Sequence, residues 1–168
     1  MAAVLDFIFF CYFITHIPIS IFVDSQVLLP QWLFPKQLIE LKSWYCREFK
    51  DTMMVNPPPW FKTFVYCEFI VQLPFFFLAA YVYIKGIQKY PWIRLPMIAY
   101  SSHVATTTAA ICFHIMNSDF KHSKPPGPKT KEERHTLLMV YLPYLFIPLL
   151  MLTNFMFRRD LQEKRKLE

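Results

Sequence analysis

Four long apolar runs separated by shorter polar segments dominate the chain. Each run is long enough to cross a bilayer as a helix, which needs about 20 mainly apolar residues. The runs lie near residues 4–23, 60–84, 95–116 and 137–157. We therefore predict an all-α membrane protein, a four-transmembrane-helix bundle that forms one domain over residues 1–168 and ends in a basic tail at residues 158–168.

The second run carries polar residues near its middle. Glu68 and Gln72 are four residues apart, so a helix places both on one face. A carboxylate at membrane depth costs on the order of 3 kcal/mol and persists where it faces a protein interior or a wet cavity. Pro74 has no amide hydrogen and leaves the Ile70 carbonyl free. We predict one wall of an internal cavity; the alternative is a polar pair used only for contact between helices.

The first run ends in a histidine, a proline and a carboxylate, which are His16, Pro18 and Asp24. A lone histidine is also a common hydrogen-bond donor between helices, and Asp24 also fits a solvated helix end. Asp51 closes the segment that connects the first two runs, so we expect Asp24 and Asp51 on the same side of the membrane, close enough to meet over the mouth of the bundle.

The connecting segment itself predicts a short amphipathic helix on the membrane surface or across the end of the bundle. Its apolar residues recur at roughly helical spacing among lysines and arginines, and are Leu38, Leu41, Trp44, Tyr45 and Phe49. Threonines of the third run are expected to bond mostly to their own helix backbone, and Tyr141 and Tyr144 of the fourth run direct hydroxyls to the interior or the interface.

Composition supports a membrane protein and excludes several other classes. The chain is 55% hydrophobic and has 14 prolines against two glycines, which predicts proline-kinked helices. The net charge of +6 comes from basic residues beside the apolar runs, where they set topology, so we expect no nucleic-acid partner. Three of the four cysteines lie inside apolar runs, and no disulfide framework, metal site or cofactor motif is recognisable.

Charge also predicts orientation. The loop from Lys85 to Arg94 has no acid, and the tail is dense in lysine and arginine, so we place both termini in the cytoplasm. Lys164 and Lys166 in KRKLE match a dilysine signal for retention in the endoplasmic reticulum. A patch that anchors anionic lipid is the alternative.

Carboxyl groups among aromatic residues predict a site for an amphiphile with a cationic or hydroxylic head. Of two close carboxyls, one keeps a proton and the ionised one pairs with an ammonium, helped by cation–π attraction. A hydroxyl-bearing lipid would instead bond to Glu68, Gln72 or Thr107. In an enzymatic interpretation, Glu68 or a histidine exchanges a proton with an alkene. No nucleophile with its base is recognisable, and we assign no catalytic residue.

Five segments carry a family resemblance: THIPISIFVDSQVLLP from 15, WYCREFKD from 44, PPPWFKTFVYCEFIVQLPFF from 57, WIRLPMIAYSSH from 92 and YLPYLFIP from 141. They closely resemble the EXPERA membrane family, which includes the sterol isomerase emopamil-binding protein. The likeness runs nearly from end to end. It departs at a short N-terminus, a longer loop around 88–91 and the KRKLE tail.

The resemblance implies a four-helix fold, usually a homodimer, with a cavity open sideways to lipid. It makes Asp24 the partner of a ligand amine and Asp51 its support. The further ligand-binding residues that it implies are Glu68, Gln72, His16, Tyr45, Thr107 and Tyr144. It implies an endoplasmic reticulum protein, with the nuclear envelope, endolysosomal and plasma membranes as further locations.

Three functions follow as hypotheses. The first is a non-catalytic receptor for sterols (cholesterol, oxysterols) and cationic amphiphilic amines that regulates cholesterol homeostasis and trafficking, with the lysosomal cholesterol transporter as a partner. The second is a sterol Δ8–Δ7 isomerase-like enzyme. The third is a trafficking chaperone that acts through protein contacts.

Overall fold

The computed structural model describes residues 2–120, 123, 126–158 and 161, and the regular secondary structure of these residues is helical. The all-α prediction is therefore confirmed for the described part of the chain. Lys164 and Lys166, the predicted retention signal, lie outside the described residues.

Seven α-helices are described, with shorter helical turns between them. The α-helices are α1 (Ala2–Phe22), α2 (Lys36–Glu48), α3 (Thr52–Val55), α4 (Pro59–Cys67), α5 (Leu73–Lys85), α6 (Arg94–Asn117) and α7 (Lys131–Phe157). The turns are η1 (Asp24–Val27), η2 (Gln31–Leu33), the π-helical η3 (Glu68–Gln72), η4 (Ile87–Lys89) and η5 (Pro91–Ile93). The predicted amphipathic helix is present as α2.

Three helical stretches are long and apolar enough to cross a membrane: Ala3–Val27, Pro59–Lys85 and Lys131–Phe157. Large apolar side chains on these stretches are exposed, as lipid contact requires; Phe7, Ile70, Ile84 and Phe146 are examples. The remaining long helix, α6, carries serines, threonines and histidines along its length. That α6 also crosses the membrane stays a prediction.

The helix α7 begins six residues before the predicted fourth span. Thr130 caps it by accepting a hydrogen bond from the Glu133 amide at 3.2 Å, and the Glu133 carboxylate accepts from the Thr130 amide at 3.2 Å. This reciprocal capping box satisfies amides that a helix start would otherwise leave unpaired. The polar first turns of α7 therefore continue the helix beyond the apolar run.

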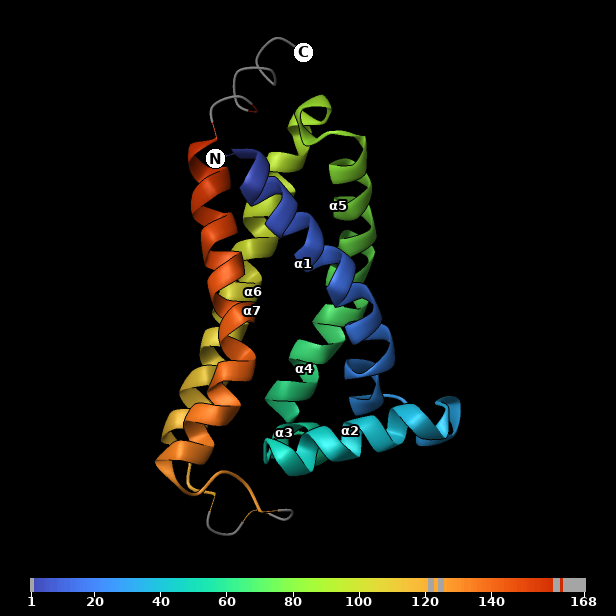
Figure 1. Cartoon of the computed structure of the whole chain (residues 1–168), viewed down its shortest axis with the longest axis vertical. Helices are drawn as coiled ribbons and strands as arrows, with labels where there is room; N and C mark the ends of the chain where they lie inside the picture. The colour runs from blue at the N-terminus through green and yellow to red at the C-terminus, as the bar shows by residue number, and fades with distance from the viewer. Residues whose placement is uncertain (1, 121–122, 124–125, 159–160, 162–168) are drawn as a thin grey trace.

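Figure 1 shows α6 and α7 lying side by side along their length, with α1 crossing in front of them to pack against α5. The start of α1, the α5–α6 connection and the end of α7 lie at one end of the bundle. At the other end α2 runs across the mouth, beside α3 and the start of α4. The two loop-bearing ends of the bundle are therefore distinct, with the α5–α6 connection at one end and α2 at the other.

Two clusters of buried apolar side chains hold these helices together. The larger lies toward the end of the bundle where α1 starts and includes Phe9, Phe13, Phe76, Met97 and Phe155. The smaller lies toward α2 and includes Met53, Phe61, Val65, Ile115 and Leu137. The space between the two clusters is where polar side chains enter the bundle.

Candidate functional site

A cavity of about 270 Å³ lies between α1, α4, α6 and α7, at the junction of the two apolar clusters. Apolar side chains such as Ile19, Val65 and Ile111 form much of its wall. Asp24 and Glu68 are the only formally charged residues among the described residues that line it. Its volume is near the lower end of ligand pockets, which hold roughly 300–1,000 Å³.

The π turn η3 explains how Glu68 and Gln72 both reach this cavity. The Leu73 amide donates to the Glu68 carbonyl, five residues back instead of four. Pro74 follows and supplies no amide, so a regular helix would leave the Ile70 carbonyl unpaired there. A π turn needs more residues per turn than an α-helix, which brings positions four apart close to the same direction. Both side chains line the cavity.

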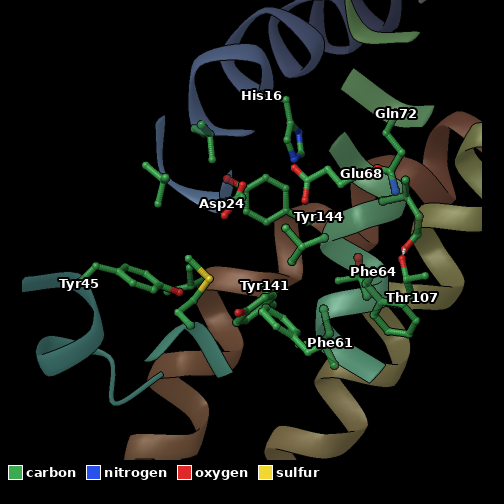
Figure 2. A pocket seen from close by; sticks show the side chains of 18 residues that line it. His16, Asp24, Tyr45, Phe61, Phe64, Glu68, Gln72, Thr107, Tyr141 and Tyr144 are labelled. Carbon is green, nitrogen blue, oxygen red and sulfur yellow. Dashed lines mark hydrogen bonds between the residues drawn. The ribbon is translucent and has the colours of Figure 1, made fainter. Parts of the chain in front are cut away.

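The carboxyl groups of Asp24 and Glu68 are hydrogen-bonded to each other. Ionised carboxylates only accept hydrogen bonds, so this pair must hold at least one proton. The Ser20 hydroxyl donates to Oε1 of Glu68 from the turn of α1 that precedes Asp24. Figure 2 shows both carboxyls at the same side of the hollow, with the Tyr144 ring beside them. The site is thus a pair of hydrogen-bonded carboxyls that holds at least one proton, set in a largely apolar wall.

His16 adds a buried polar atom to the same wall. Its ring packs against three aromatic rings, with centroid distances of 4.7 Å to Tyr12, 4.8 Å to Tyr144 and 5.0 Å to Phe76. Its Nδ1 atom is buried and has no hydrogen-bond partner among the described residues. This atom does not make the bond between helices that the alternative interpretation of His16 requires. A buried polar group without a partner costs about 1–3 kcal/mol, which a ligand or water hydrogen bond would offset.

Asp51 lies behind the cavity wall and is fully buried. Its Oδ1 caps α3 by accepting from the amides of Met53 at 3.0 Å and Met54 at 3.3 Å. Its Oδ2 accepts from the hydroxyls of Tyr45 at 3.1 Å and Tyr141 at 2.6 Å. Burial raises the pKa of the Asp51 carboxyl, against these four bonds, which favour its ionised form. Asp51 therefore holds two tyrosines that do line the cavity.

The structure brings most of the predicted site residues to this one cavity. The predicted residues that line it are His16, Asp24, Tyr45, Glu68, Gln72, Thr107 and Tyr144. The structure pairs Asp24 with Glu68, whereas the sequence predicted that Asp24 lies close to Asp51. The Thr107 hydroxyl bonds to the carbonyls of its own helix, at 3.1 and 3.2 Å, which confirms the expectation for these threonines.

Ser20 was missed by the sequence analysis. The signal was present, because Ser20 lies four residues before Asp24 and four after His16, so all three positions share a face of α1. Among the residues that the structure describes, no group of three or more histidine, cysteine or carboxylate side chains is placed to hold a metal. Its four cysteines are free thiols.

Comparisons with known proteins point in one direction. The family model described as EXPERA (EXPanded EBP superfamily) matches residues 37–155. The chain is 52% identical to Sigma intracellular receptor 2 of Xenopus tropicalis over 98% of this chain and 96% of the relative. It is 45% identical to Sigma intracellular receptor 2 of Homo sapiens over 92% of this chain and 90% of the relative. It is 30% identical to Efficient mitochondria targeting-associated protein 19 of Saccharomyces cerevisiae, over 82% of this chain and 89% of that protein.

Proposed function

The chain belongs to the EXPERA family, and from this premise we propose that it is a non-catalytic membrane receptor for amphiphiles that carry an amine or a hydroxyl. The relatives at 45–52% identity are named as intracellular receptors, over nearly their whole length. The observation that carries the proposal is the hydrogen-bonded Asp24–Glu68 pair, which faces an otherwise apolar cavity.

The carboxyl pair fits a protonated amine better than a neutral guest. With one proton shared, the pair has one negative charge, and an ammonium entering the cavity neutralises it without burying an unpaired ion. The ammonium then pairs with the negative charge that the two carboxyls share, and Asp24 is one of its contacts. The Tyr144 face beside the pair adds cation–π attraction, which is stronger where water is excluded.

Neutral sterols, including cholesterol and oxysterols, use other groups of the same cavity. A sterol hydroxyl can bond to the Gln72 amide or to the Thr107 hydroxyl, since both residues line the cavity. The apolar wall then receives the ring system. Since the cavity holds about 270 Å³, such a ligand extends out of it between the helices.

We place this receptor in intracellular membranes, chiefly the endoplasmic reticulum, with both termini in the cytoplasm and α6 as a fourth membrane crossing. The contact of α6 with α7 along their length supports that crossing. A homodimer and a role in cholesterol homeostasis and trafficking, with the lysosomal cholesterol transporter as a partner, complete the proposal.

Binding of a radiolabelled tertiary amine to the purified chain tests the assignment. Asp24→Asn removes the charge but keeps the shape, so affinity should fall roughly 10- to 100-fold, the range expected for a charge-assisted hydrogen bond. Glu40→Gln removes an exposed carboxylate on α2 and should leave affinity unchanged. Undiminished affinity in Asp24→Asn would refute the role of this residue.

A sterol Δ8–Δ7 isomerase is the second candidate, favoured by the proton held between Asp24 and Glu68 near the unpaired Nδ1 of His16. The carboxyl would protonate one alkene carbon, and the imidazole would remove a proton from the carbon beside the other. Incubation with a Δ8 sterol, followed by product analysis, separates the two functions. We expect no conversion; turnover that Glu68→Gln abolishes would establish the enzyme instead.

A further inference from the structure

One face of α2 carries a cationic stripe. Positions spaced by three and four residues along a helix share a face. The positions on this face of α2 and just beyond its end are Ile39, Lys42, Ser43, Cys46, Arg47 and Lys50. Such a stripe on a surface helix is normally apolar where it faces the protein, and here half of it is basic.

This stripe forms one side of a second hollow, of about 500 Å³, which we call the basic hollow. Gln26 and Gln31 from the turns after α1 form part of its other side, with Val55 and Pro126 at the edge. It shares no lining residue with the carboxyl cavity, so its role is independent of the proposed receptor function. None of the described residues that line it is acidic.

The three cations of the basic hollow are only partly neutralised by the protein. Lys50 pairs with Glu133 of α7 at 2.5 Å. Lys42 donates to the Gln26 carbonyl at 3.0 Å, and its burial lowers the pKa of its ammonium. Arg47 is exposed and makes no ion pair with any residue that the structure describes. Two of the three cations therefore lack an anionic partner within the described part of the chain, in a concave site that an anion can enter.

We propose that the basic hollow binds a phosphate group, with Lys42 and Arg47 as its charged contacts. Arginine offers two parallel N–H donors to phosphate oxygens, and a lysine supplies a point charge beside them. Ser43 and Gln31 add neutral polar groups that suit the remaining oxygens. Lys50 adds positive potential while it ties α2 to α7 through Glu133.

The surroundings of the basic hollow favour a phospholipid over a free anion as the source of this phosphate. Trp32, next to Gln31, is 80% exposed, and Trp44 on α2 is 51% exposed. Exposed tryptophans are enriched at the headgroup level of membranes. Val55 at the edge of the hollow is 47% exposed and offers contact to an acyl chain. The headgroup would thus lie in the hollow with its chains along apolar surface.

Titration of the purified full chain with three probes tests the proposal: a short-chain phosphatidylglycerol, the matching diacylglycerol without phosphate, and inorganic phosphate. Each cation at a membrane surface raises the affinity for an anionic lipid about fivefold. The double variant Lys42→Gln/Arg47→Gln should therefore weaken phosphatidylglycerol binding about thirtyfold. Arg47→Gln alone should weaken phosphatidylglycerol binding about fivefold. This single variant keeps the hydrogen bond between Lys42 and Gln26, so it tests the proposal even if the double variant does not fold.

The matched control is Lys36→Gln with Lys62→Gln, which removes the same charge at two exposed positions outside the hollow. It should change affinity less than about twofold. Inorganic phosphate that binds as tightly as the lipid would assign the site to a free anion, and weaker binding would assign it to the lipid. Equal losses in the variant and the control, or diacylglycerol binding as tight as phosphatidylglycerol binding, would overturn the proposal.

Discussion

Removal of the Asp51 carboxylate should destabilise the protein more than removal of any exposed carboxylate does. Asp51→Ala deletes the cap of α3, which costs about 1 kcal/mol. It also leaves the hydroxyls of Tyr45 and Tyr141 without the acceptor that they share, at about 1 kcal/mol each. We therefore expect a loss of roughly 3 kcal/mol in the free energy of unfolding.

Unfolding of the purified chain by SDS in mixed micelles measures this loss. Glu48→Ala, at an exposed position of α2, is the control and should stay within about 0.5 kcal/mol of the parent chain. The loss in the free energy of unfolding for Asp51→Asn should lie between those of Asp51→Ala and Glu48→Ala, because the amide oxygen of the asparagine still accepts from the α3 amides. A loss in Asp51→Ala no larger than in Glu48→Ala would show that the buried hydrogen bonds of Asp51 do not stabilise the fold.

The pH dependence gives this reasoning a second check. Burial raises the pKa of Asp51 above its ordinary value of 3.8, so the folded chain holds this proton more tightly than the unfolded chain does. The contribution of Asp51 to stability is then full below about pH 3.8 and declines as the pH rises through the higher folded-state pKa. Asp51→Asn should lose this part of the pH dependence.

Two further variants test contacts that join distant segments. Asp6→Asn breaks the ion pair in which Arg158 donates to both Asp6 oxygens, at 2.5 and 3.0 Å, with the Arg158 side chain only 6% exposed. We expect a loss of roughly 3 kcal/mol by SDS unfolding, because a largely buried ion pair loses one of its two charges. A loss as small as that of Glu48→Ala would contradict this. Thr130→Ala removes the cap of α7 and should cost about 1 kcal/mol in the same assay, whereas a loss as small as that of the exposed Thr136→Ala would count against the capping box.

The helices were predictable because their signals are local. Runs of apolar residues and the spacing of Leu38, Leu41 and Trp44 depend only on neighbouring positions, and they located the long helices and α2. The early start of α7 was also readable, since Thr130 and Glu133 have the spacing of a capping box. Residues 131–136 are polar and precede the apolar run that located the fourth span, so the apolar signal alone did not include them.

The partners within the site were harder to predict, because they depend on how distant segments pack. That Glu68 belongs to an internal cavity follows from the cost of a carboxylate at membrane depth. That its partner is Asp24, and that Asp51 instead holds Tyr45 and Tyr141, depends on how the start of α3 packs beside α2 and within reach of α7. Asp51 begins α3, and its carboxylate is occupied by capping bonds that the sequence did not reveal.

The π turn at Glu68–Gln72 lets the second span hold one residue more than a regular helix without turning the cavity wall away. Each residue of an α-helix advances the direction of the side chains by about 100°. One extra residue in a regular helix would therefore rotate α5 against α4 by about that angle, and the π turn absorbs it locally, so deletion of Val71 would restore an ordinary helical repeat with little rotation of the two helices. Glu68 and Gln72 would then be three residues apart and still on one face of the helix, so the length of the second span can change by one residue here while both side chains stay on the cavity side.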